Sequence, residues 1–311
     1  MVVRERHSAP AGGLGNGAAV SAPRSATATV LTWGRMVKFS HSVFALPFAL
    51  SGAALAAARY GISWRQVAWV VVAMGAARNA AMGFNRLADH AIDARNPRTA
   101  LRELPQGAVS RGAVWAFTIA LSALFIVASF ELNAICGALS PIALLIVFGY
   151  SFTKRITWAS HIVLGLSLAI APVGGWLAVA GRFAVVPLLL AAAVCFWVAG
   201  FDTIYACQDE AFDRREGLSS IPARFGIVRA LAAARVFHML ALAALAAVGV
   251  AAGLHGVYWG GLGVVAGILV WEHRLVRADD LSRLGVAFFN ANGVISLVYL
   301  GVVLAALALG K

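Results

Sequence analysis

The chain has 311 residues, of which 61% are hydrophobic and only 12% are charged. Soluble domains carry about twice that share of charge, so the composition excludes an ordinary soluble protein and indicates one that crosses a membrane several times. The net charge of +12 is explained by membrane topology and by attraction to anionic lipid head groups, and we expect no nucleic-acid partner.

Residues 1–30 are rich in Ala, Gly and Ser and lack the continuous apolar stretch of a cleavable signal peptide. Within them, "GGLGNG" has no preceding strand pattern, so it is interpreted as a flexible linker rather than a phosphate-binding loop. We predict a disordered cytoplasmic tail over 1–30 and a single transmembrane domain over 31–311.

Apolar windows long enough to cross a bilayer follow one another along the rest of the chain. Their unbroken apolar character predicts helices, because barrel strands would alternate polar and apolar residues. The predicted fold is an all-α polytopic membrane protein with nine transmembrane helices. The windows are 40–60, 66–86, 113–131, 133–151, 159–180, 184–203, 229–252, 255–272 and 285–309.

The Lys and Arg residues are distributed unevenly between the two sides of this predicted bundle. With nine spans and a cytoplasmic N-terminus, almost all of them fall on the cytoplasmic side. The exceptions on the far side are Arg59, Arg65, Arg182 and Lys311. We therefore expect a protein of the inner membrane of a bacterial-type cell, with its functional face in the cytoplasm.

The first cytoplasmic connection with a marked polar pattern begins "NRLADHAIDARNPRT" (85–99). Asn85, Asp89 and Asp93 recur every fourth residue, so a helix would present all three on one side. Arg78 lies about two turns further up the same stripe, inside the second predicted span.

A second connection repeats the pattern in "DTIYACQDEAFD" (202–213). Asp202, Asp209 and Asp213 are spaced by seven and four residues, again on one helical side, with Tyr205 between them. Both stripes end helices that run inward, where the helix dipole already presents partial negative charge. Such a position indicates a compensating cation.

Mg²⁺ is the cation that fits, because it binds carboxylate oxygens and lets phosphate oxygens complete its shell. The stripes are therefore predicted to hold Mg²⁺ around a diphosphate, with nearby basic side chains binding phosphate oxygens. The alternative is that these acids and arginines simply pair with one another in ordinary interfacial loops. The basic residues are Arg86, Arg95, Arg98 and Arg102 near the first stripe, and Arg214, Arg215 and Arg224 near the second.

Together the two stripes resemble the aspartate-rich motifs of the UbiA superfamily of intramembrane aromatic prenyltransferases. The first motif of that family is N-D-x-x-D-x-x-x-D, in which this chain has Arg86 in place of the first Asp. The second, D-x-x-Y-x-x-x-D-x-x-x-D, is matched without a gap. Shorter segments are similar to the 4-hydroxybenzoate polyprenyltransferase-like branch, which includes enzymes of the futalosine route to menaquinone: "VKFSHSVFALPFAL", "NPRTALRELPQG", "YSFTKR" and "APVGGW".

The resemblance implies nine helices around a central cavity and transfer of a polyprenyl group from its diphosphate to an aromatic acid. It leaves open whether the acceptor is 4-hydroxybenzoate, for ubiquinone, or 1,4-dihydroxy-6-naphthoate, for menaquinone. It implies that Asp89, Asp93, Asp202, Tyr205 and Asp209 take part in catalysis. The metal ligands would be Asn85, Asp89, Asp93, Asp202, Asp209 and Asp213, and the diphosphate ligands Arg86, Arg95, Arg98, Arg102, Lys154 and Arg155.

Arg78 is the most informative single basic residue, since an ionisable group inside a span is costly and usually functional. We predict that it binds the acceptor carboxylate or the diphosphate, the alternative being a structural contact between helices. Tyr205 has an alternative as an interfacial aromatic anchor, and Lys154 and Arg155 as markers of the membrane edge. Lys38, His41 and His161 fit either the mouth of the pocket or plain packing.

Two other functions remain in view. Haem or chlorophyll-type prenyl transfer belongs to the same superfamily, and a secondary transporter is a different class with a similar number of helices. Transporters place their ligands near the bilayer midplane, whereas these carboxylates lie at helix ends. We expect prenyl diphosphate, an aromatic acid and membrane lipid as partners, and no obligate protein partner.

Overall fold

The computed structural model describes residues 32–34, 36 and 44–310, except for the side chains of 288 and 289. The predicted disordered tail, and the pair Lys38 and His41, lie outside the described residues. Within the described part the chain forms helices and turns, with one isolated bridge between Arg277 and Asp280. The all-α fold class is confirmed.

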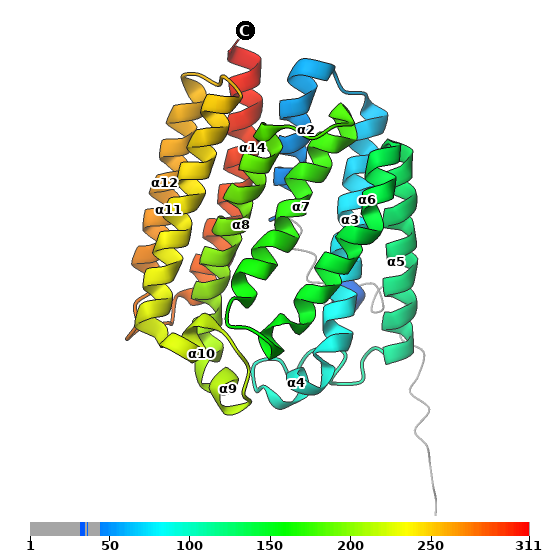
Figure 1. The fold of residues 1–311 in the computed structure, drawn as a ribbon. Helices are drawn as coiled ribbons and strands as arrows, with labels where there is room; N and C mark the ends of the chain where they lie inside the picture. Colours follow the sequence, from blue (N-terminus) through cyan, green and yellow to red (C-terminus); the bar gives the residue numbers. More distant parts are fainter. Residues whose placement is uncertain (1–31, 35, 37–43, 311) are drawn as a thin grey trace, which may run out of the picture.

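The long helices stand side by side as a bundle (Figure 1). In chain order they are α2 (Leu46–Tyr60), α3 (Trp64–Ala88), α5 (Arg111–Leu132), α6 (Ala134–Gly149), α7 (Ser160–Ala180), α8 (Val185–Ala206), α11 (Ile227–Ala251), α12 (Val257–Leu275) and α14 (Asn292–Leu309). The short elements are α4 (His90–Arg95), η2 (Tyr150–Arg155), η3 (Cys207–Asp209), α9 (Glu210–Arg215), α10 (Ile221–Phe225), α13 (Leu284–Val286) and the π-helical turn η4 (Ala287–Ala291).

Of the described helices, 7 are long and apolar enough to cross a membrane. The other two long helices, α2 and α12, pack in the same bundle but are not among them. α2 has 15 described residues, and α12 ends in a polar run that includes Glu272, His273 and Arg274. The chain is an integral membrane protein. Nine long helices are described, but only those seven meet both criteria, so the expected count of nine spans is not confirmed exactly.

Side chains that cap helix N-termini fix where several helices begin. Ser63 accepts from the backbone N–H of Gln66, and the Gln66 side chain accepts in return from the Ser63 backbone, which forms a complete capping box before α3. Ser110 caps α5 and Asn133 caps α6 in the same way, through one side-chain oxygen each. These caps satisfy N–H groups that the helix itself leaves unpaired.

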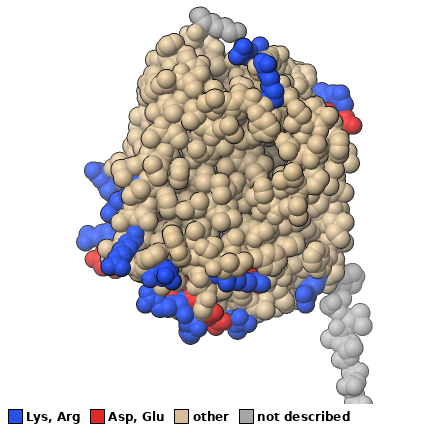
Figure 2. Space-filling view, viewed as in Figure 1, with Lys and Arg blue, Asp and Glu red and all other residues tan. Residues whose placement is uncertain are grey.

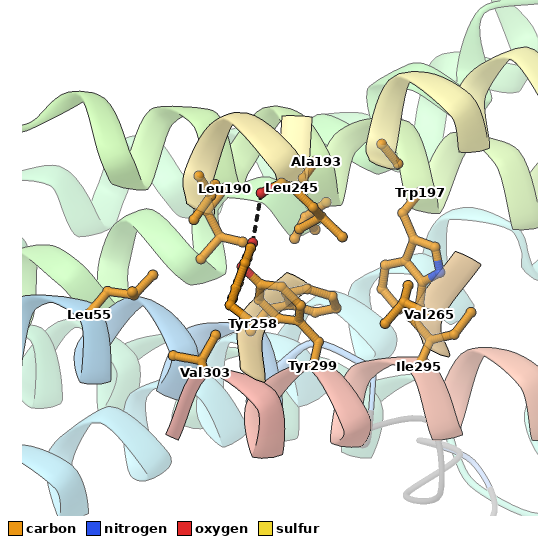
Figure 3. Packing of buried hydrophobic residues seen from close by; sticks show 14 of the residues in the cluster. Leu55, Leu190, Ala193, Trp197, Leu245, Tyr258, Val265, Ile295, Tyr299 and Val303 are labelled. Carbon is orange, nitrogen blue, oxygen red and sulfur yellow. Dashed lines mark hydrogen bonds between the residues drawn. The ribbon is translucent and has the colours of Figure 1, made fainter. Parts of the chain in front are cut away.

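One apolar cluster joins α2, α8, α11, α12 and α14 (Figure 3). Tyr258 and Tyr299 are fully buried at its centre, with their hydroxyls 3.3 Å apart, and Tyr258 donates to the Leu245 carbonyl at 2.7 Å. Each buried hydroxyl therefore has a partner, which removes the free-energy cost of leaving it unpaired in an apolar interior.

Close contact between α2 and α7 depends on glycine. A Cβ atom at Gly52 of α2 would lie 2.1 Å from the Pro172 carbonyl oxygen, and one at Gly175 of α7 would lie 1.9 Å from the Ala49 oxygen. Only glycine allows the two backbones to approach this closely, as is common between membrane helices. The contact holds α7 against α2, so that α7 forms one wall of the cavity described below.

Charged side chains gather at one end of the bundle (Figure 2). This is the end at which α4, α9 and α10 lie (Figure 1), and we call it the charged end. Both acidic sequence stripes are located there.

Candidate active site

The first acidic segment begins in α3 and continues into α4. α3 ends at Ala88, and Asp89 stands between the two helices with φ −95° and ψ 7°. The hydrogen bonds of a helix nevertheless continue through the break, from Asp89 N to Asn85 O at 2.9 Å and from Asp93 N to Asp89 O at 2.7 Å. The four-residue register predicted from the sequence is present, although the helix itself is interrupted.

The second acidic segment has nearly the same backbone. α8 carries Asp202 and Tyr205, Asp209 ends the short helix η3, and Asp213 lies in α9. Asp209 has φ −100° and ψ 2°, almost the angles of Asp89, and a six-residue helix follows each of them. The two segments are therefore two versions of one local structure: a long helix, a break at the central Asp, and a short helix that buries the next Asp.

The loop after α4 joins the two segments across more than a hundred residues of sequence. Arg98 donates to both carboxylate oxygens of Asp209, from Nε at 2.9 Å and from Nη2 at 2.6 Å, and Asn96 donates to Oδ1 at 3.2 Å. The remaining Arg98 nitrogen, Nη1, lies 3.2 Å from the Tyr205 hydroxyl. Charge-assisted bonds of this bidentate kind are strong and geometrically specific.

Asp93 lies between two arginines. Arg102 Nη1 is 2.7 Å from each of its carboxylate oxygens, and Arg86 Nη1 is 3.8 Å from Oδ2. Only 3% of the Arg86 side chain is exposed, and its Nε donates to the Met36 carbonyl at 3.3 Å. Arg86, which stands in place of the first Asp of the family motif, thus places a buried positive charge close to Asp93, the last acid of that motif.

Lys154 and Arg155, at the end of η2, each contact a different acidic segment. Arg155 Nη2 donates to the Ala88 carbonyl at 2.6 Å and to Asp89 Oδ1 at 3.1 Å, which places a cation at the C-terminus of α3. Lys154 Nζ lies 3.9 Å from Asp213 Oδ2. Neighbouring residues of one short helix therefore bridge the two segments.

The carboxyl of Asp89 is only partly compensated. Burial raises its pKa above the ordinary value, the nearby Asp93 carboxylate raises it further, and the Arg155 contact opposes both effects. Asn85 Nδ2 donates to its other oxygen at 3.0 Å. Asp89 is thus a partly buried acid whose ionised form is paired, among the described residues, only with Arg155, a side chain that is itself partly exposed.

Asp202 has a partner that the sequence left undecided. His161 Nδ1 is 2.7 Å from Asp202 Oδ2, and His161 Nε2 accepts the backbone N–H of Ile221 at 3.3 Å. Because Nε2 accepts, the neutral ring must carry its proton on Nδ1 and donate it to Asp202. The imidazole is fully buried, so this orientation is fixed. The sequence signal for His161 was its position as a polar residue at the start of an apolar span.

The predicted basic ligands do not all lie in one place. Arg86, Arg98, Arg102, Lys154 and Arg155 contact the acidic segments as described. Arg95 instead donates to Glu216 at 2.8 Å, and over half of its side chain is exposed. Several of the predicted ligands therefore pair with one another in this conformation.

The described residues contain no group of three or more His, Cys, Asp or Glu placed to hold a metal ion. The donor chemistry still suits a hard divalent cation, since both segments present carboxylate oxygens. Asp213 adds a second indication, because its Oδ2 is buried and has no hydrogen-bond partner. The acids fit a metal, provided that their arginine partners move to another anion.

A cavity of about 580 Å³ runs from the acidic segments into the bundle. Asn85, Arg86, Arg102, Asp202 and Tyr205 line its polar end. Its walls are otherwise mainly apolar, with side chains from α2, α3, α5, α6, α7 and α8 and from Phe44, which precedes α2. The apolar residues of the helices include Val70, Met74, Phe125, Leu139, Val147, Leu164, Leu168 and Phe201. Arg78 also lines this cavity, and its Nη1 donates to the Asn79 side-chain oxygen at 3.2 Å.

A helical membrane bundle with an apolar cavity that ends at paired acidic segments is the arrangement that the motif resemblance predicts for an intramembrane prenyltransferase. The UbiA prenyltransferase family model matches residues 45–309, so the chain belongs to that family and is an aromatic prenyltransferase.

The named relatives support this family assignment. The chain is 34% identical over 226 residues to the 4-hydroxybenzoate octaprenyltransferase of Xanthomonas campestris, covering 72% of this chain and 74% of the relative. It is 33% identical to a UbiA homologue from Aeropyrum pernix solved in its apo form, with a TM-score of 0.74, covering 87% and 98% of the two chains. A homologue from Archaeoglobus fulgidus, solved bound to GPP and Mg²⁺, has the same fold at 19% identity, with a TM-score of 0.67 and coverage of 89% and 99%.

Proposed function

We propose that this chain transfers a polyprenyl group from polyprenyl diphosphate to a ring carbon of an aromatic carboxylic acid. One observation carries the proposal: a single cavity joins the acidic segments to an apolar compartment inside the bundle. A polyprenyl diphosphate has the same two parts, a charged head and an apolar tail. A tail longer than the cavity must continue into the lipid, which explains why such an enzyme is embedded in a membrane.

The reaction needs stabilisation of the leaving diphosphate. The bond between the allylic carbon and the diphosphate oxygen breaks with its electron pair on the diphosphate, and the ring carbon then bonds the allylic cation and loses its proton. Arg98, Arg102, Lys154 and Arg155 exchange their aspartate partners for diphosphate oxygens, and Arg86 supports them from the buried side. Such charge stabilisation is the largest contribution in many enzymes.

Mg²⁺ is the metal we propose, supported by the carboxylate donors here and by its presence in the Archaeoglobus fulgidus homologue. When bound, it supplies positive charge to the diphosphate as that group departs. The residues that would hold it, directly or through water, are Asn85, Asp89, Asp93, Asp202, Asp209 and Asp213.

Arg78 is proposed to bind the carboxylate of the acceptor. It lines the same cavity about two turns from Asn85, so an aromatic acid held there would lie on the apolar side of the diphosphate site. We expect Arg78→Ala to raise the KM of the acceptor about 10- to 100-fold, since a charge-assisted bond is worth about 1.5–3 kcal/mol. Arg65→Ala, at the opposite end of α3, is the matched control. Unchanged KM values for both substrates would exclude this role.

The acceptor itself is 4-hydroxybenzoate or 1,4-dihydroxy-6-naphthoate, and the name of the Xanthomonas campestris relative favours the first. Washed membranes that contain the protein would be incubated with a polyprenyl diphosphate and each acceptor in turn, and product mass read. EDTA should abolish product and added Mg²⁺ should restore it. Product formation indifferent to chelation would contradict the metal, and no product from either acid would favour the haem or chlorophyll-type reaction.

The excess of Lys and Arg at the charged end supports a cytoplasmic location for that end, in a bacterial-type inner membrane. The proposed active site then faces the cytoplasm. Labelling of single cysteines at the two ends of the bundle, in intact cells and in inverted vesicles, would test the orientation.

A further inference from the structure

A second cavity lies on the outer side of the bundle, away from the acidic segments. It has a volume of about 410 Å³, and its lining comes from α11, from α12 and from the turn that follows α12. Arg235, Arg274 and Arg277 line it, together with His273 and Asp279. Lys and Arg are visible on this flank near the charged end in Figure 2, where α11 and α12 stand at the edge of the bundle in Figure 1.

Two of these arginines differ from those of the active site. In the part of the chain that the structure describes, neither Arg235 nor Arg274 has an ion-pair or hydrogen-bond partner. Arg277 is paired with Asp279 through Nε at 3.3 Å, so the one acid of the cavity is already engaged. The positive-inside tendency explains the sign of these charges. It does not explain why two unpartnered arginines converge on one cavity.

The surfaces next to the two arginines are apolar and exposed. On α11, Met239 lies one turn further into the membrane from Arg235, and 60% of its surface is exposed. On α12, Val270 and Trp271 lie one turn from Arg274 in the same direction, with 52% and 45% exposed. Arg235 and Arg274 therefore each lie one turn from an apolar, exposed side of their helix, on the charged-end side of it.

We propose that this cavity binds the head group of an anionic phospholipid, with an acyl chain along the exposed sides of α11 and α12. The cations suit a phosphate diester at the depth of the membrane surface. The neighbouring apolar side chains suit a hydrocarbon chain, which a free phosphate does not have. This proposal does not depend on the proposed prenyl transfer, because it concerns a different cavity.

Native mass spectrometry of the purified full-length protein tests it, with phosphatidylglycerol and phosphatidylcholine of identical acyl chains added in turn. We expect phosphatidylglycerol to be retained more strongly, and the double variant Arg235→Gln/Arg274→Gln to lose that preference by roughly thirtyfold in apparent affinity. The matched control, Arg111→Gln/Arg229→Gln, removes two exposed arginines from the same end of the bundle. Arg229 lies six positions before Arg235 and so points about 120° away from it round the helix.

Three results would overturn the proposal. The first is an unchanged preference in the double variant, and the second is an equal loss in the control, which would mean general surface charge. The third is displacement of phosphatidylglycerol by millimolar inorganic phosphate, which would identify a free anion as the ligand. Prenyl transfer measured on the same samples reports separately on the active site.

Discussion

The two acidic segments share a backbone but distribute their counter-charges in opposite ways. In the first, the last acid is neutralised, because Asp93 is bonded to Arg102 and lies near Arg86, while the central Asp89 has weaker partners. In the second, the central Asp209 has Arg98 and Asn96, while Asp213 has a buried oxygen without a hydrogen bond.

We infer from this crossed arrangement that the acids have two different tasks. Asp93 and Asp209 hold the arginine-rich loop between Asn96 and Arg102 in place. Arg102 of this loop lines the polar end of the cavity. Asp89 and Asp213 remain undercompensated, and both lie next to η2. Under the proposed function, these two acids should dominate the affinity for Mg²⁺, and the other two should dominate stability.

The largest expected effect is the loss of stability in Asp93→Asn. The change leaves the buried Arg86 guanidinium and Arg102 without their counter-charge, and breaking a buried pair from one side costs about 3–5 kcal/mol. The melting temperature in detergent should fall by several degrees. Asp213→Asn is the matched variant and should leave the melting temperature unchanged or raise it, because the buried charge that it removes is compensated only by Lys154 at 3.9 Å. Equal destabilisation by both substitutions would contradict the division of tasks.

Next in size is the loss of activity in Asp89→Asn and Asp213→Asn. Each should lower kcat/KM roughly a hundredfold or more and raise the Mg²⁺ concentration needed for half-maximal rate, since an amide is a weaker ligand than a carboxylate. The measurement is a Mg²⁺ titration of prenyl transfer at saturating diphosphate. Glu216→Gln, at the same end of the bundle, should leave the titration unchanged. A Mg²⁺ requirement unaltered in both Asp variants would remove these residues from the metal site.

His161 should have a smaller effect, because it acts through Asp202. His161→Leu removes the donor to Asp202 and should lower kcat/KM about 10- to 100-fold, as is usual when a partner that orients a ligand is lost. His161→Asn places an N–H group near the position of Nδ1 and should recover most of the rate, which a purely packing role would not predict. If Leu and Asn behave alike, His161 does not orient Asp202.

The smallest expected effect is a shift in pH dependence that originates in Asp89. Because its pKa is raised, Asp89 takes up a proton at a higher pH than an ordinary aspartate, and a proton competes with Mg²⁺. The Mg²⁺ concentration needed for half-maximal rate should therefore rise as the pH falls, and the rise should begin at a pH above the usual pKa range of aspartate.

A second trend concerns stability. Folding disfavours the ionised form of Asp89, so without Mg²⁺ the free energy of unfolding should increase as the pH falls through the pKa of Asp89 in the folded state. Asp89→Asn should abolish both trends, and their persistence would assign them to another group.

Much of the site was predictable from spacing alone. The recurrence of Asn85, Asp89 and Asp93 requires one helical register, and the structure keeps that register through the break at Asp89. The contacts made by Arg98 and His161 were not predictable, because each joins residues that are far apart in sequence. Arg95 and Arg98, only three positions apart, bind different acids for the same reason.

The sequence by itself determined the membrane-spanning helical class, the charged end and the family, because hydrophobic length, Lys and Arg bias and motif spacing are local properties of the chain. Only the tertiary structure decided which acid is neutralised and which is left undercompensated. That difference depends on where the arginines of one loop reach across the bundle, and desolvation and counter-charge act through space rather than along the sequence.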